Sequence, residues 1–280
     1  MNRKKRPDPL SRFLFSVILL GAFVTIAILT YIVLYIIVKG APYITPSLFS
    51  LKYNSENVSL LPAMITTIII TVLALLISVP IGIATSIYLV EYAKKGNKLV
   101  DIVGLTAETL AGIPSIVYGL FGLLFFVTTL KWGFSILSGA CTLAIMILPL
   151  IIKTTEEALK SVPDLYREAS FGLGAGKLRT VFKIVLPTAV PGILAGVILG
   201  IGRIVGETAA LIYTAGTVAK IPENIFSSGR TLSVHMYALS SEGLHTNQAY
   251  ATALVLLMTV LIINILSNRV AKKLTKGRSR

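Results

Sequence analysis

An arginine and a glutamate, Arg203 and Glu207, lie in an apolar stretch that runs from Leu186 to Ala215. The four-residue spacing places both side chains on one face of a helix, where they can form an ion pair. Because an arginine near the middle of a bilayer costs about 2.5 to 3.5 kcal/mol on insertion scales, the pair must face protein or a water-filled cavity. The guanidinium of Arg203 could bind a passing oxyanion, with Glu207 neutralising it when the path is empty. A structural clamp between helices is the alternative.

Glycines share this helical face. Gly192, Gly196 and Gly200 repeat at four-residue spacing, and Arg203 and Glu207 continue their row. At 100° per residue, these five positions fall within about 80° of one another. Glycine at every fourth residue lets a second helix approach closely. The sequence therefore predicts a helix contact along this row, with the two charged side chains directed away from lipid.

Weaker candidates for a substrate path flank a proline in an earlier apolar stretch. Ser115 and Tyr118 follow Pro114 and could line the path. Hydroxyl groups in apolar helices, however, more often bond a neighbouring carbonyl. Glu108 precedes the same stretch and could belong to an interfacial helix or to a gate.

Patterns for catalysis or metal binding are absent from the sequence. His235 and His245 have no carboxylate or cysteine at metal-ligand spacing, so we expect surface histidines in an external loop. Cys141 is the only cysteine and lies within an apolar stretch, which excludes an intrachain disulfide and a cysteine-based metal site. We expect no enzyme active site and no cofactor in this chain.

A glycine-rich turn, GLGAGK at residues 172–177, invites comparison with a phosphate-binding loop. Such a loop needs glycine, four spacers and then Gly-Lys-Ser/Thr, because backbone amides and the lysine hold phosphate while the hydroxyl group ligates magnesium. Here Phe171 occupies the first glycine position and Leu178 the hydroxyl position, and no strand pattern precedes the turn. The sequence does not predict nucleotide binding at this turn.

The composition indicates a membrane protein. Of the 280 residues, 55% are hydrophobic and 14% are charged, and the mean hydropathy is +0.83. The formal net charge of +14 would also suit nucleic acid, but the charges lie in blocks between apolar runs and not on one soluble face. We expect contact with membrane lipid and none with nucleic acid.

Six apolar stretches are long enough to cross about 30 Å of hydrocarbon as helices, which predicts an all-α polytopic membrane protein. They run from Leu14 to Val38, Leu61 to Val90, Ile113 to Leu130, Phe134 to Ile152, Leu186 to Ala215 and Tyr250 to Leu266. Pro80, Pro114, Pro149 and Pro191 lie within them, and each removes a helical hydrogen bond. Broken helices would suit a transport path, and ordinary kinks in a packed bundle explain the prolines equally well.

Basic residues predict the orientation of the spans. Of 26 lysines and arginines, 20 fall on the side of the N-terminus, the loops at 91–105 and 153–185 and the C-terminus, and five fall on the other side. We therefore expect both termini to be cytoplasmic. The first apolar stretch is too long for a secretion signal and lacks a small-residue cleavage site, so we expect an uncleaved anchor.

A short helix is predicted across the cytoplasmic face, between Val162 and Phe171. Ser161 can cap it, Pro163 suits its first turn, and Asp164 adds a favourable charge at its N-terminus. After this helix, glycine at position 174 permits a sharp, left-handed turn. An amphipathic segment then leads to Leu186-Pro187.

This region resembles the EAA loop of ABC importer permeases. Glu168-Ala169-Ser170, three spacers, Gly174, nine spacers and Ile184-Val185-Leu186-Pro187 match the motif, with serine in place of the second alanine. In that family the helix fits a groove on a cytoplasmic ATPase, so the resemblance implies that a partner binds ATP and magnesium. The small side chains also allow a close approach, and the glutamate could fix the loop by hydrogen bonds. The implied coupling residues are Glu168, Ala169, Ser170, Gly174, Leu186 and Pro187.

Two further segments are similar to the PstA-type permease subunit of phosphate ABC importers. They are LAGIPSIVYGLFG at 110–122 and GRIVGETAALIYTAG at 202–216, and the similarity covers most of residues 61–268. It implies a type I ABC importer permease, the MetI-like architecture, with six transmembrane helices and a cytoplasmic coupling helix. The implied segments are basic cytoplasmic tails at 1–13 and 269–280, a first transmembrane helix and external loop at 14–60, and a permease domain at 61–268 with its EAA loop at 155–187.

The resemblance also implies partners and a location. The partners are a PstC-type permease subunit, an ATPase homodimer on the cytoplasmic face and an external phosphate-binding protein, in a bacterial or archaeal cytoplasmic membrane. Phosphate, sulfate and molybdate are all tetrahedral anions, and only the resemblance favours phosphate. A self-contained anion channel or secondary transporter is the competing function, in which Arg203 and Glu207 would form a selectivity or proton site.

Overall fold

The computed structural model describes residues 9–94, 96 and 98–276, and these residues form helices, turns and loops without any strand. Five of the helices are long and apolar enough to cross a membrane, and one bent pair of helices makes a sixth span if it is counted as one. The five are α1 (Pro9–Gly40), α2 (Leu61–Ile87), α5 (Ile136–Lys160), α8 (Leu186–Val205) and α11 (Thr246–Lys276). The predicted all-α membrane fold is confirmed. Parts of the predicted basic tails, residues 1–8 and 277–280, lie outside the described residues.

The third predicted span is the bent pair. α3 (Lys98–Ala111) and α4 (Ser115–Gly122) meet at 103°, and the π-helical turn η4 (Leu123–Thr129) continues α4. Pro114 lies at the bend with extended dihedral angles, as expected for a residue that cannot donate a helical hydrogen bond. The predicted span from 113 to 130 was therefore incomplete, because helix α3 occupies residues that were expected to be mostly loop.

The other three prolines leave their helices continuous. Pro80 lies inside α2, Pro149 inside α5 and Pro191 inside α8. Pro149 is buried within the bundle, where neighbouring helices can satisfy the carbonyl group that it frees, whereas Pro80 and Pro191 lie on exposed faces of their helices. Of the four prolines, only Pro114 coincides with a break.

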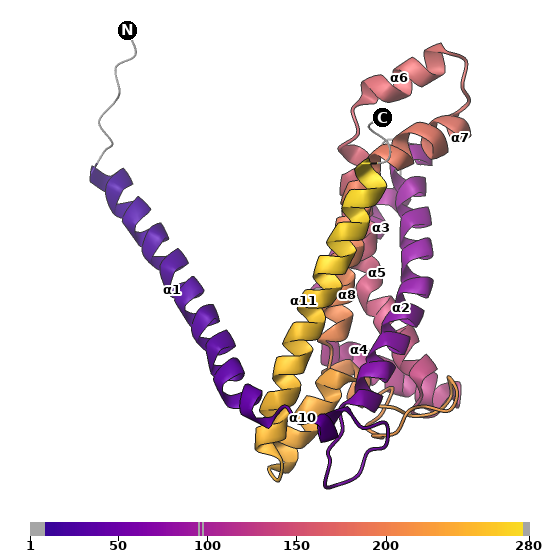
Figure 1. Cartoon of the computed structure of the whole chain (residues 1–280). Helices are drawn as coiled ribbons and strands as arrows, with labels where there is room; N and C mark the ends of the chain where they lie inside the picture. Colours follow the sequence, from indigo (N-terminus) through magenta and orange to yellow (C-terminus); the bar gives the residue numbers. More distant parts are fainter. Residues whose placement is uncertain (1–8, 95, 97, 277–280) are drawn as a thin grey trace.

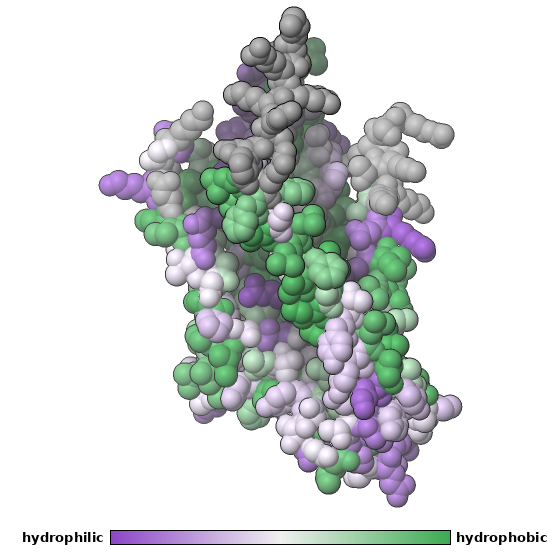
Figure 2. Space-filling model, turned by 90° about the vertical axis from the view of Figure 1, so that its left-hand side faces the viewer, coloured by the Kyte–Doolittle hydropathy of each residue, from purple (hydrophilic) through white to green (hydrophobic). Residues whose placement is uncertain are grey.

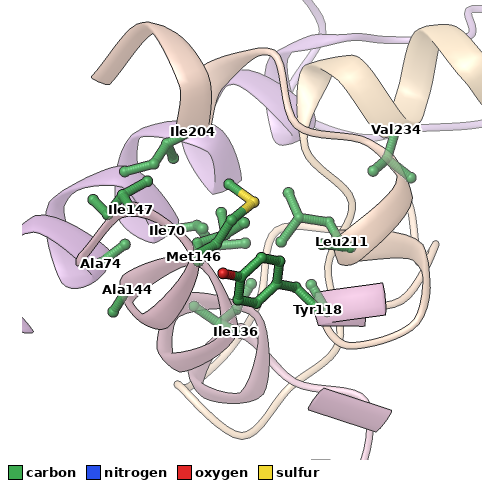
Figure 3. Packing of buried hydrophobic residues seen from close by; sticks show 13 residues of the cluster. Ile70, Ala74, Tyr118, Ile136, Ala144, Met146, Ile147, Ile204, Leu211 and Val234 are labelled. Carbon is green, nitrogen blue, oxygen red and sulfur yellow. The ribbon is translucent and has the colours of Figure 1, made fainter. Parts of the chain in front are cut away.

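Helices α2, α5 and α8 form the centre of the bundle (Figure 1). Their largest cluster of buried side chains joins Ile70 of α2, Met146 and Ile147 of α5 and Ile204 of α8 to Tyr118 of α4 (Figure 3). In a bilayer the helices gain little from leaving lipid, so close van der Waals packing is what holds such a cluster together. This packing fixes the position of α8, which carries the predicted charged residues.

Helix α1 stands apart from the bundle along most of its length (Figure 1). Nearly all of its described side chains are exposed, and its contact with α11 lies at its C-terminal end. There, a Cβ atom on Gly40 would lie 2.5 Å from the carbonyl oxygen of Tyr250, and the Tyr35 and Tyr250 rings lie 5.8 Å apart. Figure 2 views the molecule from the side on which α1 lies, and apolar side chains cover much of the middle of that face. Such a helix requires lipid or another protein around it.

The two ends of the bundle carry different elements. The coupling end, as we call it, holds α6 (Asp164–Gly172) and α7 (Lys177–Thr180), together with the start of α1 and the end of α11 (Figure 1). The opposite end holds α10 (Leu232–Glu242), the short helix α9 (Ala209–Ile212) and the 3-10 turns η1 (Ala41–Tyr43) and η2 (Pro46–Phe49). The described chain therefore begins and ends at the same end as the predicted coupling helix.

Candidate functional site

The glycine row of α8 packs against α5 as predicted. A Cβ atom on Gly192 would lie 2.6 Å from the Cβ of Ala158, and one on Gly196 would lie 2.6 Å from the Cβ of Thr154. At Gly200 the nearest side-chain atom belongs to Ile151, at 3.4 Å. The close approach of the two helices thus depends most on the first two glycines.

A single methyl group should reveal this dependence. We expect Gly196→Ala to lower the free energy of unfolding by about 1–3 kcal/mol, because the added atom overlaps Thr154 and forces α5 and α8 apart. Gly202→Ala, in the same helix but with no atom within 4 Å of the new Cβ, is the matched control and should be neutral or slightly stabilising. Thermal unfolding of the purified variants in detergent measures both, and equal midpoints would contradict the predicted overlap.

The predicted ion pair between Arg203 and Glu207 does not form. Helix α8 ends at Val205, so the two residues no longer share a helical face. Glu207 is only 9% exposed, and its Oε1 accepts a hydrogen bond of 3.1 Å from the amide of Ala210 at the start of α9. Ser233 of α10 donates a 2.6 Å hydrogen bond to the backbone carbonyl of Glu207. Glu207 therefore stabilises the break between α8 and α9, and the predicted span to residue 215 was too long.

Arg203 is left without a counter-ion. Its side chain is partly exposed, and it makes no hydrogen bond or ion pair within the described part of the chain. It lies within electrostatic range of Tyr118 of α4. A partly exposed guanidinium in the last turn of a membrane helix can still offer its donors to an anion or to a group on another chain.

The two hydroxyl candidates differ in their surroundings. Tyr118 is 5% exposed, lies among Met146 and Leu211 (Figure 3), and donates a 2.8 Å hydrogen bond to the carbonyl of Leu110. Its hydroxyl group thus bonds a neighbouring carbonyl, the alternative that the sequence left open. Ser115 is partly exposed at the start of α4. The structure brings Tyr118 near Arg203. For Ser115, partial exposure is the one feature that supports a place in the substrate path.

Glu108 lies on α3 and pairs with Lys153 of α5. Both side chains are about half exposed, at 59% and 47%. An ion pair of this exposure contributes little to stability by itself, typically about 0 to 1 kcal/mol. It joins the bent third span to the central helix α5 near the coupling end.

A buried polar cluster at the opposite end escaped the sequence analysis. His235 of α10 is fully buried, which corrects the expectation of a surface histidine, whereas His245 is partly exposed. The guanidinium of Arg230 lies 4.7 Å from the centre of the Tyr53 ring, and that ring meets the imidazole of His235 edge to face at 6.1 Å. Burial, reinforced by the charge of Arg230, lowers the pKa of His235 to about 3. Tyr53, which covers His235, lies in a loop about 180 residues earlier in the chain. No local sequence pattern around His235 therefore signals that this histidine is buried.

This histidine predicts acid sensitivity. An unfolded chain binds a proton at His235 near pH 6.5, and the folded chain takes it up only near pH 3. The stability contributed by the neutral imidazole is therefore complete above pH 6.5 and is lost as the pH falls toward 3, by up to about 1.4 kcal/mol per pH unit. We expect His235→Gln to flatten the fall in unfolding temperature between pH 7 and pH 4, while His245→Gln follows the parent. Parallel pH profiles for parent and His235→Gln would contradict the assignment.

The predicted short helix exists as α6, with a different start. Its first residue is Asp164, Pro163 occupies the N-cap position, and the Ser161 hydroxyl group bonds the carbonyl of Ala158. Ser161 is therefore not a cap, because its side chain turns back to the end of α5. Gly174 has a φ of +81°, which confirms the left-handed turn predicted at this position.

The serine of the EAA-like motif has a specific partner. Ser170 is buried, and its hydroxyl group forms a 2.8 Å hydrogen bond with that of Thr180 in α7. An alanine, the more usual residue in the motif, could not make this bond. The bond closes the turn that contains Gly174 and holds α6 against α7.

The outer surface of this loop is apolar and hollowed. Leu165 is 71% exposed and Leu173 is 89% exposed, while Phe171, which is 47% exposed, borders a hollow that Glu91 and Arg167 also line. A groove of about 390 Å³ lies beside Leu173, and Ala169 and Gly174 are among its other lining residues. Glu168 is exposed and makes no hydrogen bond within the residues described, so it does not fix the loop as expected. Exposed apolar side chains gathered on one loop are typical of a protein contact.

The last two motif residues connect the loop to the bundle. Leu186 and Pro187 begin α8, where proline suits the first helical turn. Leu186 packs against a buried cluster that includes Leu159 of α5 and Val181 of the π-helical turn η5 (Val181–Val185). A displacement of the loop would therefore reach α8 directly through the chain.

Known proteins resemble this chain over most of its length. Residues 78–280 match the family described as binding-protein-dependent transport system inner membrane component. The probable ABC transporter permease protein YqgI of Bacillus subtilis is 34% identical over 98% of this chain and 99% of its own length. The phosphate transport system permease protein PstA of Yersinia pestis is 36% identical over 71% of this chain and 68% of its own.

Solved structures share the fold at lower identity. A bacterial ABC transporter that imports the acidic polysaccharide alginate superposes with a TM-score of 0.70 and 17% identity, over 94% of this chain and 96% of that one. The MetNI methionine ABC transporter in an inward-facing conformation gives a TM-score of 0.61 and 20% identity, over 76% and 93% of the two chains. The predicted MetI-like architecture is confirmed.

Proposed function

The chain belongs to the binding-protein-dependent transport system inner membrane component family, and we propose that it is the membrane-spanning permease subunit of an ATP-driven phosphate importer. Its PstA relatives, named as phosphate transport system permeases, support phosphate as the substrate. In this proposal the chain itself is not an enzyme and holds no cofactor. ATP and magnesium bind to a partner.

The observation that carries the proposal is the exposed apolar surface of the loop from α6 to α7. Leu165, Phe171 and Leu173 would contact water if this loop were a simple connector. We propose that a cytoplasmic ATPase covers them, with Glu168, Ala169, Ser170 and Gly174 forming the contact. Leu186 and Pro187 then pass the motion of the loop to α8.

A second permease completes the path in this proposal. The detached helix α1 leaves apolar side chains uncovered on several sides, which supports a similar, PstC-type chain packed beside it. Two ATPase copies and an external phosphate-binding protein complete the assembly. Because the basic residues favour one side, we place the coupling end and both termini in the cytoplasm, in a bacterial or archaeal cytoplasmic membrane.

For the substrate path we propose Arg203 as the residue that contacts phosphate. Its guanidinium is partly exposed and has no counter-ion among the described residues, so it is free to bind an anion. Ser115 and Tyr118 lie on α4 as weaker candidates. Glu207 supports the path by fixing the break after α8, and a clamp formed with another chain is the alternative role for both charges.

Reconstitution tests the proposal against a self-contained channel. The chain, its neighbouring permease and the ATPase are placed in vesicles with phosphate-loaded binding protein outside. We expect phosphate uptake only with internal ATP and with every component present, and weaker uptake when sulfate or molybdate replaces phosphate. Phosphate flux through the chain alone, without ATP, would contradict the importer.

A further inference from the structure

Arg167 of α6 uses every nitrogen of its guanidinium group. Nε and Nη2 donate to Glu91 Oε1 at 3.1 and 2.7 Å, and Nη2 also donates to the carbonyl of Leu159 at 3.0 Å. Nη1 donates to the carbonyl of Val162 at 2.8 Å and to Asp164 at 3.2 Å. One side chain thus joins α6 to the end of α5 and to the π-helical turn η3 (Tyr88–Tyr92), which extends α2.

The pair of Arg167 and Glu91 is largely withdrawn from solvent. The two side chains are 15% and 7% exposed, respectively. A fork of two donors onto one carboxylate fixes both distance and direction, and low exposure limits competition from water. This geometry distinguishes the pair from the exposed contact of Arg167 with Asp164, whose side chain is 87% exposed.

The coupling loop, by which we mean the segment from α6 to α7, makes few other side-chain hydrogen bonds to the helix bundle. A hollow of about 620 Å³, lined by Glu91, Arg167, Phe171 and Lys177 among others, lies between α6 and the helix ends. Among the described residues, the hydrogen bonds from α6 side chains to α5 and η3 all come from Arg167. On the other side of the hollow, the ammonium group of Lys177 lies 5.0 Å from the centre of the Tyr92 ring.

From this geometry we propose that Arg167 and Glu91 form a clasp that makes the coupling loop move as one body with the cytoplasmic ends of α2 and α5. The inference rests on the proposed function, because it assumes that an ATPase moves this loop. Without the clasp, a push on α6 would bend the loop into the hollow. With the clasp, the same push reaches α2 through η3 and α5 through the carbonyls of Leu159 and Val162. Arg167 and Glu91 are positioning residues, which touch neither ATP nor phosphate.

A role as a simple helix cap would not require Glu91. The carbonyl of Leu159 lies in the last turn of α5 and also accepts a 3.3 Å hydrogen bond from the amide of Val162, and the carbonyl of Val162 lies just beyond that helix. A single arginine can cap both carbonyls. The carboxylate of Glu91 comes from a segment 76 residues away and orients the guanidinium from the opposite side. A π-helical turn is a common site of functional distortion within a helix, and here it presents Glu91 toward the loop. The clasp therefore connects elements that a cap alone would leave independent.

The test compares Glu91→Ala, Glu91→Gln and Arg167→Gln in the reconstituted importer, with ATP hydrolysis and phosphate uptake measured in the same vesicles. We expect each variant to retain its ATPase, because the exposed apolar surface is unchanged. Phosphate transported per ATP hydrolysed should fall roughly tenfold, a size typical of coupling between sites. Glu91→Gln keeps an acceptor for Arg167, so in this variant the phosphate transported per ATP hydrolysed should fall less. Glu156→Gln, which breaks an exposed pair with Lys160 on α5, is the control and should stay within about twofold of the parent.

A cross-link separates mechanical connection from charge. In a Cys141→Ser background, cysteines at positions 91 and 167 are joined by a short bifunctional thiol reagent. We expect the double cysteine variant to be uncoupled before treatment and to recover most of its phosphate per ATP afterwards. Recovery supports the clasp, and failure to recover in a complex that is cross-linked and retains its ATPase overturns it.

The outcomes also separate the clasp from the proposed function. Parent-like phosphate per ATP in Glu91→Ala and Arg167→Gln overturns the clasp and leaves the importer standing. Loss of the ATPase from these variants overturns the clasp as well, because the pair would then serve docking. Absence of ATP-dependent uptake in the parent complex contradicts the importer itself.

Discussion

Replacing Arg203 by glutamine is expected to remove most phosphate uptake while the importer still assembles and hydrolyses ATP. Glutamine keeps much of the length of the side chain but removes its charge and its fork of donors. Hydrogen bonds to a charged group contribute about 1.5–3 kcal/mol, so loss of one such contact lowers uptake by roughly ten- to a hundredfold. Uptake of radiolabelled phosphate, at matched expression, measures the effect. Arg203→Lys keeps the charge without the fork and should retain part of the uptake.

The structure sharpens the distinction between a path residue and a clamp. Arg203 and Glu207 do not pair within the chain, so Arg203→Gln leaves no carboxylate newly unpaired. We expect little change in the unfolding temperature of Arg203→Gln for this reason. Glu207→Gln should also be tolerated, since its amide oxygen can still accept the hydrogen bond from Ala210.

The double variant Arg203→Gln with Glu207→Gln decides between the two roles. If Arg203 contacts phosphate, removal of the second charge restores nothing, and uptake stays at the level of the single variant. If the two charges instead clamp another chain, removing both relieves the unpaired charge and transport returns. Uptake near the parent value, with equal amounts of assembled complex, would exclude Arg203 as a phosphate contact.

Regular and local features of this protein could be predicted from its sequence. Apolar length alone located the long spans, because a bilayer admits few other structures. The row of Gly192 and Gly196 predicted the close packing of α8 on another helix, since only small residues permit it. Gly174 predicted a left-handed turn for an equally local reason, the missing Cβ atom.

Contacts between distant segments could not be predicted in this way. The end of α8 at Val205 depends on Ser233, which binds the carbonyl of Glu207 from a helix 26 residues away. Extending a helical row across Gly206 was therefore the step that produced a false ion pair. His235 is buried beside Tyr53, and Arg167 meets Glu91 across 76 residues. A single sequence carries no sign of which segments meet.

The turn at Gly174 provides the second large expected effect. At a φ of +81°, a residue with a Cβ atom loses about 1–2 kcal/mol, and a β-branched residue loses more. No atom lies within 4 Å of a Cβ built at this position, so added bulk contributes nothing and the strain is purely conformational. We expect Gly174→Val to be inserted in the membrane but to open the turn between α6 and α7.

Opening that turn should release the ATPase. The bond between Ser170 and Thr180 holds α6 against α7 only while the chain reverses at Gly174, so the apolar surface loses its shape when the turn opens. A strain of this size corresponds to a loss of roughly tenfold or more in the affinity for the ATPase. Gly176→Val is the matched control, because that residue has a φ of −74° and a ψ of 162°, which valine adopts readily, and it also has no atom within 4 Å of a Cβ. Copurification of the ATPase with each variant, followed by ATP hydrolysis in vesicles, tests the difference. Equal retention by Gly174→Val and Gly176→Val would mean that the ATPase does not dock on this loop, and the coupling assignment would have to be withdrawn.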